Sequence, residues 1–154
     1  MKLKIALFFM FALFATTTYA KTVDPITNIT TDQAAKSEGP YSQGTLVDLQ
    51  KGKLLFISGQ IPNDKTGKLH DETIQTATRY TLNNIKAILK AAGSDWKYVV
   101  RMDVVMKDIN EWDKMNEEYK KQFPNGIYPA RQSVQAVIDE RIRISCIAYV
   151  PNKE

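Results

Sequence analysis

The chain has 154 residues, a quarter of them charged, and a formal net charge of +4. Lys2 and Lys4, in the first 20 residues, account for two of these charges, and the +2 that remains is too small to favour nucleic acid or an anionic membrane as a partner. Cys146 is the only cysteine, so no intramolecular disulfide can form, and its apolar neighbours indicate a buried thiol. Because His70 is the only histidine and lies in a polar loop, the chain offers neither a zinc-ligand cluster nor a base to activate a cysteine.

The first 20 residues have the pattern of a targeting segment. Lys2 and Lys4 precede an apolar run from Ile5 to Ala15, and small and polar residues follow up to Ala20. This order is typical of a cleaved secretory signal, and the run is too short to span a bilayer. We therefore expect residues 1–20 to be removed and the mature chain to be periplasmic or secreted, without a membrane anchor.

The mature chain is expected to form one domain, residues 37–154, after an N-terminal arm, 21–36, with order beginning near Ser37. The segment Gly39-Pro40-Tyr41-Ser42-Gln43 predicts a turn that leads into a hairpin, whose second arm, residues 54–60, is apolar on both faces. Gly59 in that arm would let a ligand or another backbone approach closely.

A helix and a strand follow the hairpin. Apolar side chains recur at helical spacing from Thr73 to Ala92, and Gly93 is placed to end the helix. Residues 99–106 alternate, which predicts a strand with Arg101 and Asp103 on one face. The other face would carry Val100, Met102, Val104 and Met106.

A second helix is expected after Asn110, which is placed to cap it. One stripe of this helix carries Trp112, Met115, Tyr119 and Phe123. Asn116 lies beside that stripe, where an unpaired amide would cost roughly 1 to 3 kcal/mol. Asn116 therefore either caps a backbone group at the edge of the core or lines a polar pocket.

The segment Tyr128-Pro129-Ala130-Arg131 joins this helix to the last expected strands. Pro129 fixes its own φ and pushes Tyr128 into an extended conformation, so Arg131 would be presented from a stiff turn. A guanidinium that is held still can bind a carboxylate or phosphate through two parallel hydrogen bonds. Arg131 is thus a candidate anion clamp; the alternative is a surface charge that caps the preceding loop.

Residues 134–138 and 142–150 predict two strands joined by a turn at Asp139-Glu140. The last strand has an apolar face, from Ile142 to Val150, and an opposite face too polar for a core and too apolar for open water. The order of elements predicts an α/β sheet with both helices on one face, and a second copy of the chain is the simplest cover for the other. The opposite face of the last strand carries Arg141, Arg143, Ser145, Ile147 and Tyr149.

Several short motifs occur along the chain in a fixed order: Gly39-Pro40-Tyr41-Ser42-Gln43, Ile57-Ser58-Gly59-Gln60-Ile61-Pro62, Asn84-Ile85 with Ala92-Gly93, Asn116 with Tyr119, and Pro129-Ala130-Arg131. Together they resemble the RidA/YjgF/YER057c family of imine deaminases, over residues 37–150. The resemblance implies a chorismate-mutase-like fold, assembled as a homotrimer with a cleft at each subunit interface. It also implies hydrolysis of reactive 2-imino acids or their enamine tautomers to 2-keto acids and ammonia, with no metal or organic cofactor.

The same resemblance implies the site residues. Arg131 matches the residue that grips the substrate carboxylate, and Tyr41, Ser58 and Asn116 match residues that line the cleft. In the well-studied deaminase branch the last strand has two glutamates, the second of which helps orient the hydrolytic water.

This chain departs from that branch at three positions. Arg143 and Ser145 replace the two glutamates, and Ser133 replaces a frequent cysteine. Ser145 can hydrogen-bond a water but cannot act as a carboxylate base at neutral pH. Losing general-base assistance typically costs about 10²- to 10⁴-fold in rate.

Two functions of different class therefore remain open. The chain is either a deaminase whose water is held by Ser145 and backbone carbonyls, or a binding module for small carboxylates that keeps the clamp and has lost the chemistry. Retention of Arg131, Tyr41, Ser58 and Asn116 as a set favours the deaminase. Ribonuclease activity, with which some relatives have been labelled, is disfavoured by the near-balanced charge and by the lack of a histidine near the expected cleft.

Overall fold

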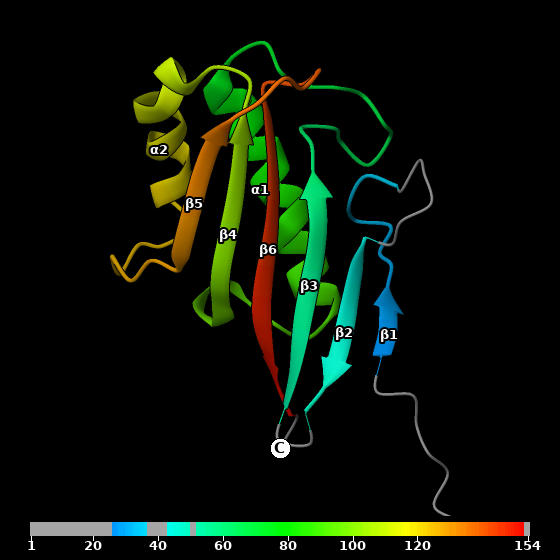
Figure 1. The fold of residues 1–154 in the computed structure, drawn as a ribbon. Helices are drawn as coiled ribbons and strands as arrows, with labels where there is room; N and C mark the ends of the chain where they lie inside the picture. Colours follow the sequence, from blue (N-terminus) through cyan, green and yellow to red (C-terminus); the bar gives the residue numbers. More distant parts are fainter. Residues whose placement is uncertain (1–25, 37–42, 50–51, 153–154) are drawn as a thin grey trace, which may run out of the picture.

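The computed structural model describes residues 26–36, 43–49 and 52–152. Six strands form one sheet in the order β1-β2-β3-β6-β4-β5 (Figure 1), and every neighbouring pair is antiparallel except β4 with β5. The expected signal segment and Tyr41 lie outside the described residues. The strands are β1 Ile26–Ile29, β2 Gly44–Asp48, β3 Gly52–Gln60, β4 Val99–Met106, β5 Ala130–Gln135 and β6 Ile142–Pro151, and the helices are α1 Ile74–Ala91 and α2 Trp112–Lys120.

The arm at 21–36 contains a strand that the sequence did not predict. Strand β1 pairs with β2, so order begins before Ser37, contrary to expectation. The buried amide of Gln43 anchors the arm by donating to the carbonyls of Thr31 and Ala35, at 3.1 and 2.7 Å. A four-residue edge strand is too short to show an alternation, which explains why the pattern was missed.

Helix α1 forms as predicted. The hydroxyl oxygen of Thr73 accepts from the backbone N–H of Thr76 and caps the start, and Gly93, at φ +81°, follows the end. Its buried stripe packs against β3 and β6. None of the described helices is long and apolar enough to cross a membrane.

Strand β4 also forms as predicted, except at Val100. The register with β6 shifts between Val99 and Arg101, so Val100 lies at an irregularity and is 52% exposed instead of joining the inner face. The remaining inner-face residues are buried: Met102, Val104 and Met106.

The start of α2 differs from expectation, because Asn110 does not cap it. The carboxylate of Asp108 accepts from both the backbone N–H and the side-chain amide of Asn110, at 2.9 and 3.0 Å. Asp108 thereby caps a short 3₁₀ turn, Ile109–Glu111, which leads into α2 at Trp112. Asn110 does not cap α2 because it lies inside this 3₁₀ turn, whose capping position, Asp108, comes two residues earlier, and no side chain caps α2 itself.

The strand expected at 134–138 is shifted towards the N-terminus. Strand β5 begins at Ala130 and pairs in parallel with β4, where Met102 lies opposite Arg131. Arg131 is therefore held within a strand and not in a turn, while Val137 lies beyond the strand and is fully exposed. Strand β4 separates β5 from β6, so the last two strands are not neighbours.

The two faces of the sheet differ as the alternation in β6 predicts. The inner face of β6 is buried, and helix α1 lies behind it with α2 alongside α1 (Figure 1). Cys146 lies on this buried face of β6, and burial raises the pKa of its thiol to about 12.

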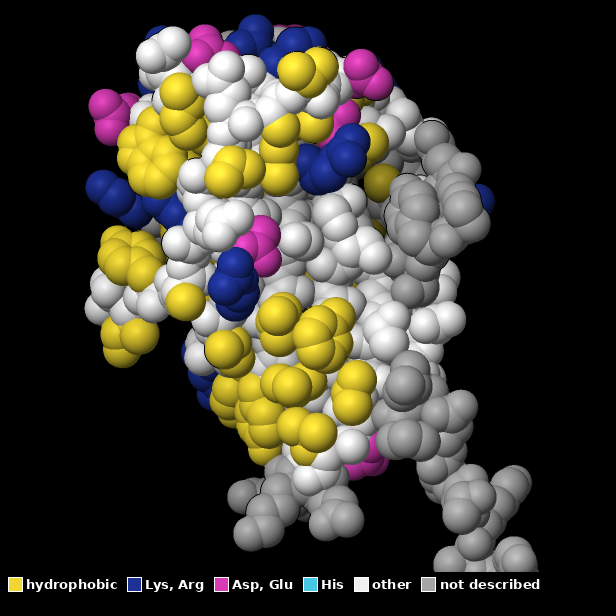
Figure 2. Space-filling view, viewed as in Figure 1, with side chains coloured by type: hydrophobic (Ala, Val, Ile, Leu, Met, Phe, Trp, Pro, Cys, Tyr) yellow, Lys and Arg dark blue, Asp and Glu magenta, His cyan; other side chains and the backbone are white. Residues whose placement is uncertain are grey.

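Neither helix covers the opposite face of the sheet, where apolar side chains gather over the lower half (Figure 2). These include Phe56, which is 41% exposed, and its cross-strand neighbour Ile147.

Candidate functional site

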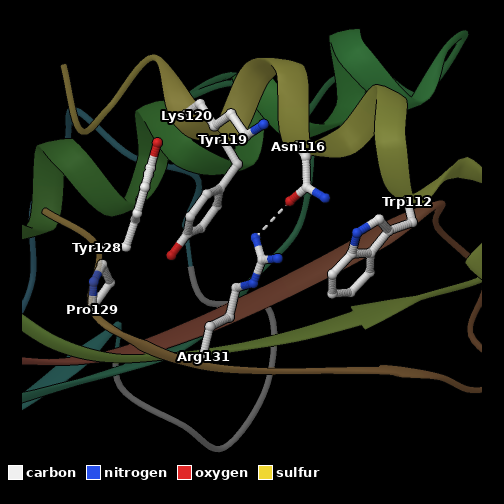
Figure 3. Close-up of a pocket in the computed structure, with 7 residues that line it drawn as sticks. All are labelled: Trp112, Asn116, Tyr119, Lys120, Tyr128, Pro129 and Arg131. Carbon is white, nitrogen blue, oxygen red and sulfur yellow. Dashed lines mark hydrogen bonds between the residues drawn. The ribbon is translucent and has the colours of Figure 1, made fainter. Parts of the chain in front are cut away.

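A pocket of about 330 Å³ lies between α2 and the start of β5 (Figure 3). Its walls come from the helix, from the segment that enters the strand, and from the strand itself. This is the place where the sequence predicted an anion clamp. The lining residues are Trp112, Asn116, Tyr119, Lys120, Tyr128, Pro129 and Arg131.

Arg131 rises from β5 towards α2 and is held on three sides (Figure 3). Its Nη1 donates to Oδ1 of Asn116 at 2.8 Å. Its Cζ lies 4.7 Å from the ring centroid of Trp112 and 4.5 Å from that of Tyr119. All three partners are neutral, and no carboxylate among the described residues pairs with Arg131. The guanidinium is thus fixed in place with its charge uncompensated, which suits it to bind an anion.

Helical spacing explains why these side chains meet. Trp112, Asn116 and Tyr119 stand at i, i+4 and i+7 of one stripe, which faces Arg131 across the pocket. Of the two roles left open for Asn116, the structure supports the pocket. The sequence predicts Trp112 and Tyr119 as members of the core stripe, with Tyr119 also in a motif with Asn116, and gives neither a role in the pocket. Their spacing from Asn116 is the signal that they share its pocket.

Tyr119 contributes a buried hydroxyl beside the arginine. The residue is 3% exposed, and its Oη has no hydrogen-bond partner among the described residues. Burial raises the pKa of Tyr119 to about 12, and the nearby positive charge of Arg131 opposes that rise. At neutral pH Tyr119 is therefore an un-ionised phenol that can donate to a ligand.

Ser58 lies elsewhere, in a second pocket of about 380 Å³ lined by Ser58, Gly59, Ile61 and Arg143. Ile57 pairs with Cys146 and Gln60 with Ile144, so two residues of β3 bulge opposite the single residue Ser145. The structure thus divides the predicted site: Arg131 and Asn116 lie together, whereas Ser58 and Ser145 lie on neighbouring strands at a different place. Tyr41 lies outside the described residues.

His70 and Asp64 do not line the arginine pocket. His70 stacks on Tyr80, at 3.9 Å between ring centroids, and its Nε2 lies 3.0 Å from Oδ2 of Asp64. Hydrogen bonds from Thr66 and His70 hold the pKa of Asp64 well below its usual range. The described residues contain no cluster of His, Cys, Asp or Glu that could hold a metal ion.

Comparison with known proteins identifies the fold. The family model described as Endoribonuclease L-PSP matches residues 31–150. The chain belongs to the RidA/YjgF family. Among its RidA/YjgF relatives, a RutC family protein of Pyrococcus horikoshii is 44% identical over 125 residues, which are 79% of this chain and 95% of the relative. A human protein named 2-iminobutanoate/2-iminopropanoate deaminase is 38% identical over 124 residues, covering 78% and 87% of the two chains.

Solved RidA/YjgF structures share the same arrangement of strands and helices. Escherichia coli TdcF, solved with bound serine, has a TM-score of 0.71 and 37% identity and covers 79% of this chain and 97% of its own. The E. coli YjgF gene product has a TM-score of 0.71 and 35% identity over 79% and 97% of the two chains. The predicted RidA-type sheet with two helices is thereby confirmed.

Proposed function

We propose that this protein hydrolyses reactive 2-imino acids, or their enamine tautomers, to 2-keto acids and ammonia. The observation that carries the proposal is the uncompensated guanidinium of Arg131, held by Asn116 and two aromatic rings at the wall of a pocket. Such a group suits the α-carboxylate that every 2-imino acid carries. Two relatives support this choice of ligand: the human one is named for 2-imino acids, and TdcF was solved with an amino acid bound.

The reaction needs little from the protein beyond positioning. Water adds to the imine carbon and one of its protons moves to nitrogen. The C–N bond then breaks as the carbonyl forms, and the departing ammonia takes the second proton of the water. An iminium, R–C(=NH₂⁺)–COO⁻, and one water thus give R–CO–COO⁻ and NH₄⁺. Arg131 would fix the carboxylate, and Ser145 with backbone carbonyls would hold the water.

The site is proposed to be completed in a homotrimer. Within one chain the Arg131 pocket and the Ser58 pocket have no lining residue in common. The sheet face that neither described helix covers carries apolar side chains, including Phe56 and Ile147, which are suited to burial against another copy (Figure 2). Packing that face against the α2–β5 edge of a neighbour would bring the two pockets together in one shared cleft.

Export is proposed as well. The basic start, the short apolar run and the small residue at position 20 occur in the order of a cleaved signal. Mass spectrometry of the extracytoplasmic fraction should recover a chain that begins at Lys21. Recovery of only a cytosolic chain that retains Met1 would contradict export.

A second candidate, a non-catalytic binding module for small carboxylates, is favoured by one observation. No carboxylate lines either pocket in the described part of the chain, and Ser145 stands where the deaminase branch has its water-orienting glutamate. Such a module would bind 2-keto acids through Arg131 without accelerating imine hydrolysis.

The test generates 2-imino acids in situ with an amino-acid oxidase and follows their decay to keto acid. We expect the wild type to exceed the spontaneous rate and Arg131→Ala to fall to it, because the carboxylate contact is lost. Arg79→Ala is the matched control, since Arg79 is half exposed on α1 and lies outside both pockets. A wild type that neither binds keto acids nor hydrolyses imines would reject both candidates.

Restoring the missing carboxylate separates the two candidates. A deaminase adapted to serine should change little or decline in Ser145→Glu, whereas a binding module should gain hydrolysis. The double variant with Arg143→Glu belongs beside it, because Arg143 could pair with the new glutamate and hold it away from the water.

A further inference from the structure

The second pocket contains an arginine that the proposed reaction does not use. Arg143 lies on the same face of β6 as Ser145, two residues away, and forms one wall of the pocket with Ser58, Gly59 and Ile61. Side chains two residues apart on a strand point to the same side. Arg143 therefore stands beside the groups proposed to hold the water.

Two contacts hold the Arg143 side chain in this position. Its Nε donates to Oε1 of Glu140 at 2.6 Å, and the Glu140 side chain is only 7% exposed. The aliphatic stem crosses Gly59, where a Cβ would lie 2.9 Å from Cδ of Arg143. Gly59 thus allows a close approach, as the sequence predicted, but the approaching group is this side chain.

The terminal amino groups of Arg143 are left available. Nε of Arg143 makes its one hydrogen bond, and neither Nη1 nor Nη2 has a partner among the described residues. A guanidinium whose Nε is fixed presents its two terminal N–H groups as a fork, the arrangement that matches a carboxylate. Because Glu140 offsets its charge, Arg143 would recognise a second carboxylate by hydrogen-bond geometry more than by net attraction.

We propose that Arg143 selects substrates with a second carboxylate, so that the preferred class is the 2-imino dicarboxylic acids. The inference rests on the proposed function, in which Arg131 binds the α-carboxylate and the two pockets share one cleft in the trimer. The imine carbon then lies between the two arginines, beside Ser58 and Ser145, and the distal carboxylate of the substrate reaches the fork of Arg143.

The test compares two keto acids with the same five-carbon chain, 2-oxoglutarate and 2-oxopentanoate, by isothermal titration calorimetry on the mature protein. They differ only in whether the chain ends in a carboxylate or a methyl group. We expect 2-oxoglutarate to bind at least about tenfold more tightly to the wild type, the effect of one hydrogen-bonded charged group. Equal affinities would overturn the inference.

Four variants assign the preference to a residue. Arg143→Met should reduce 2-oxoglutarate affinity to that of 2-oxopentanoate and leave 2-oxopentanoate within about twofold, whereas Arg143→Lys should keep only part of the preference. Because Arg143→Met leaves the buried Glu140 unpaired, Glu140→Gln/Arg143→Met is made beside it, and both are checked by thermal unfolding. Lys120→Met is the competing variant, since Lys120 lines the Arg131 pocket. Loss of the preference in Lys120→Met and not in the Arg143 variants would overturn the inference.

Failure of the inference can be told apart from failure of the proposed function. If 2-oxopentanoate binds and Arg131→Ala abolishes that binding, the clamp stands whatever Arg143 does. If neither keto acid binds the wild type, the clamp and the dicarboxylate preference are both rejected.

Discussion

The two arginine pockets hold their guanidinium groups in opposite ways. Arg131 is fixed by an amide and two aromatic rings, all neutral, whereas Arg143 is fixed by the buried carboxylate of Glu140. The first arrangement leaves a full positive charge for the ligand, and the second offsets the charge and leaves only directed donors. A neutral support therefore suits an arginine that attracts an anion, and a charged support suits one that discriminates between anions.

The largest effect is expected from a variant that prevents trimer formation and so keeps the Arg131 pocket of one subunit away from the Ser58 pocket of its neighbour. Phe56→Asp places a charge on the apolar part of the open face, opposite Ile147, and should prevent trimer formation. Light scattering should then give the monomer mass, against three times that mass for the wild type, and keto acid binding should weaken with it. Leu69→Asp is the matched control, because Leu69 is 45% exposed in the loop after β3. A wild type that is already monomeric at micromolar concentration would contradict the shared cleft.

A substitution of Arg131 that preserves its positive charge should have the second largest effect on keto acid binding. Arg131→Lys keeps the positive charge but loses the planar fork and its stacking on Trp112 and Tyr119. We expect 2-oxopentanoate to bind about 10- to 100-fold more weakly by calorimetry, the scale of a lost charge-assisted contact. The same change at Arg143 should leave this monocarboxylate unaffected. Equal effects at the two arginines would remove the distinction between them.

Removing the amide support of Arg131 should have a smaller effect. Asn116→Ala deletes the hydrogen bond to Nη1 and leaves the two rings to position the guanidinium. We expect keto acid affinity to fall by about tenfold, with little change in the melting temperature, because Asn116 is only part-buried. Asn110→Ala on the exposed entry to α2 serves as control and should bind as the wild type does. Unchanged affinity in Asn116→Ala would mean that the rings alone hold the clamp.

The smallest expected effect is on stability at alkaline pH, and it arises from Cys146 on the buried face of β6. Burial raises the pKa of Cys146 from 9.0 to about 12, so the folded chain keeps the thiol protonated where the unfolded chain ionises it. Its contribution to stability is complete below pH 9 and is lost as the pH rises towards 12. The urea midpoint should fall between pH 8 and pH 10.5 by more in the wild type than in Cys146→Ala. If the urea midpoint fell equally in the two proteins, the Cys146 thiol would be excluded as a cause of the loss of stability at alkaline pH.

Alternation and helical periodicity were sufficient for the longer elements. Helix α1 and the inner faces of β4 and β6 form where the sequence placed them, because each buries a stripe that repeats over several turns or pleats. The predictions failed where the signal was short or was overridden by neighbours: the four-residue β1, the irregularity at Val100 and the cap at Asp108.

By itself, the sequence determined the fold class through periodicity, and it named Arg131, Tyr41, Asn116, Ser58 and Ser145 through motifs that resemble the RidA/YjgF family. Both kinds of signal are local properties of the chain. Only the tertiary structure decided how the described residues of this set are grouped. Arg131 meets Asn116 because the parallel pairing of β5 with β4 brings it under α2, a contact that no local pattern encodes. The tertiary structure likewise laid Arg143 across Gly59 and tied it to Glu140, since side-chain contacts between strands depend on register and bulges.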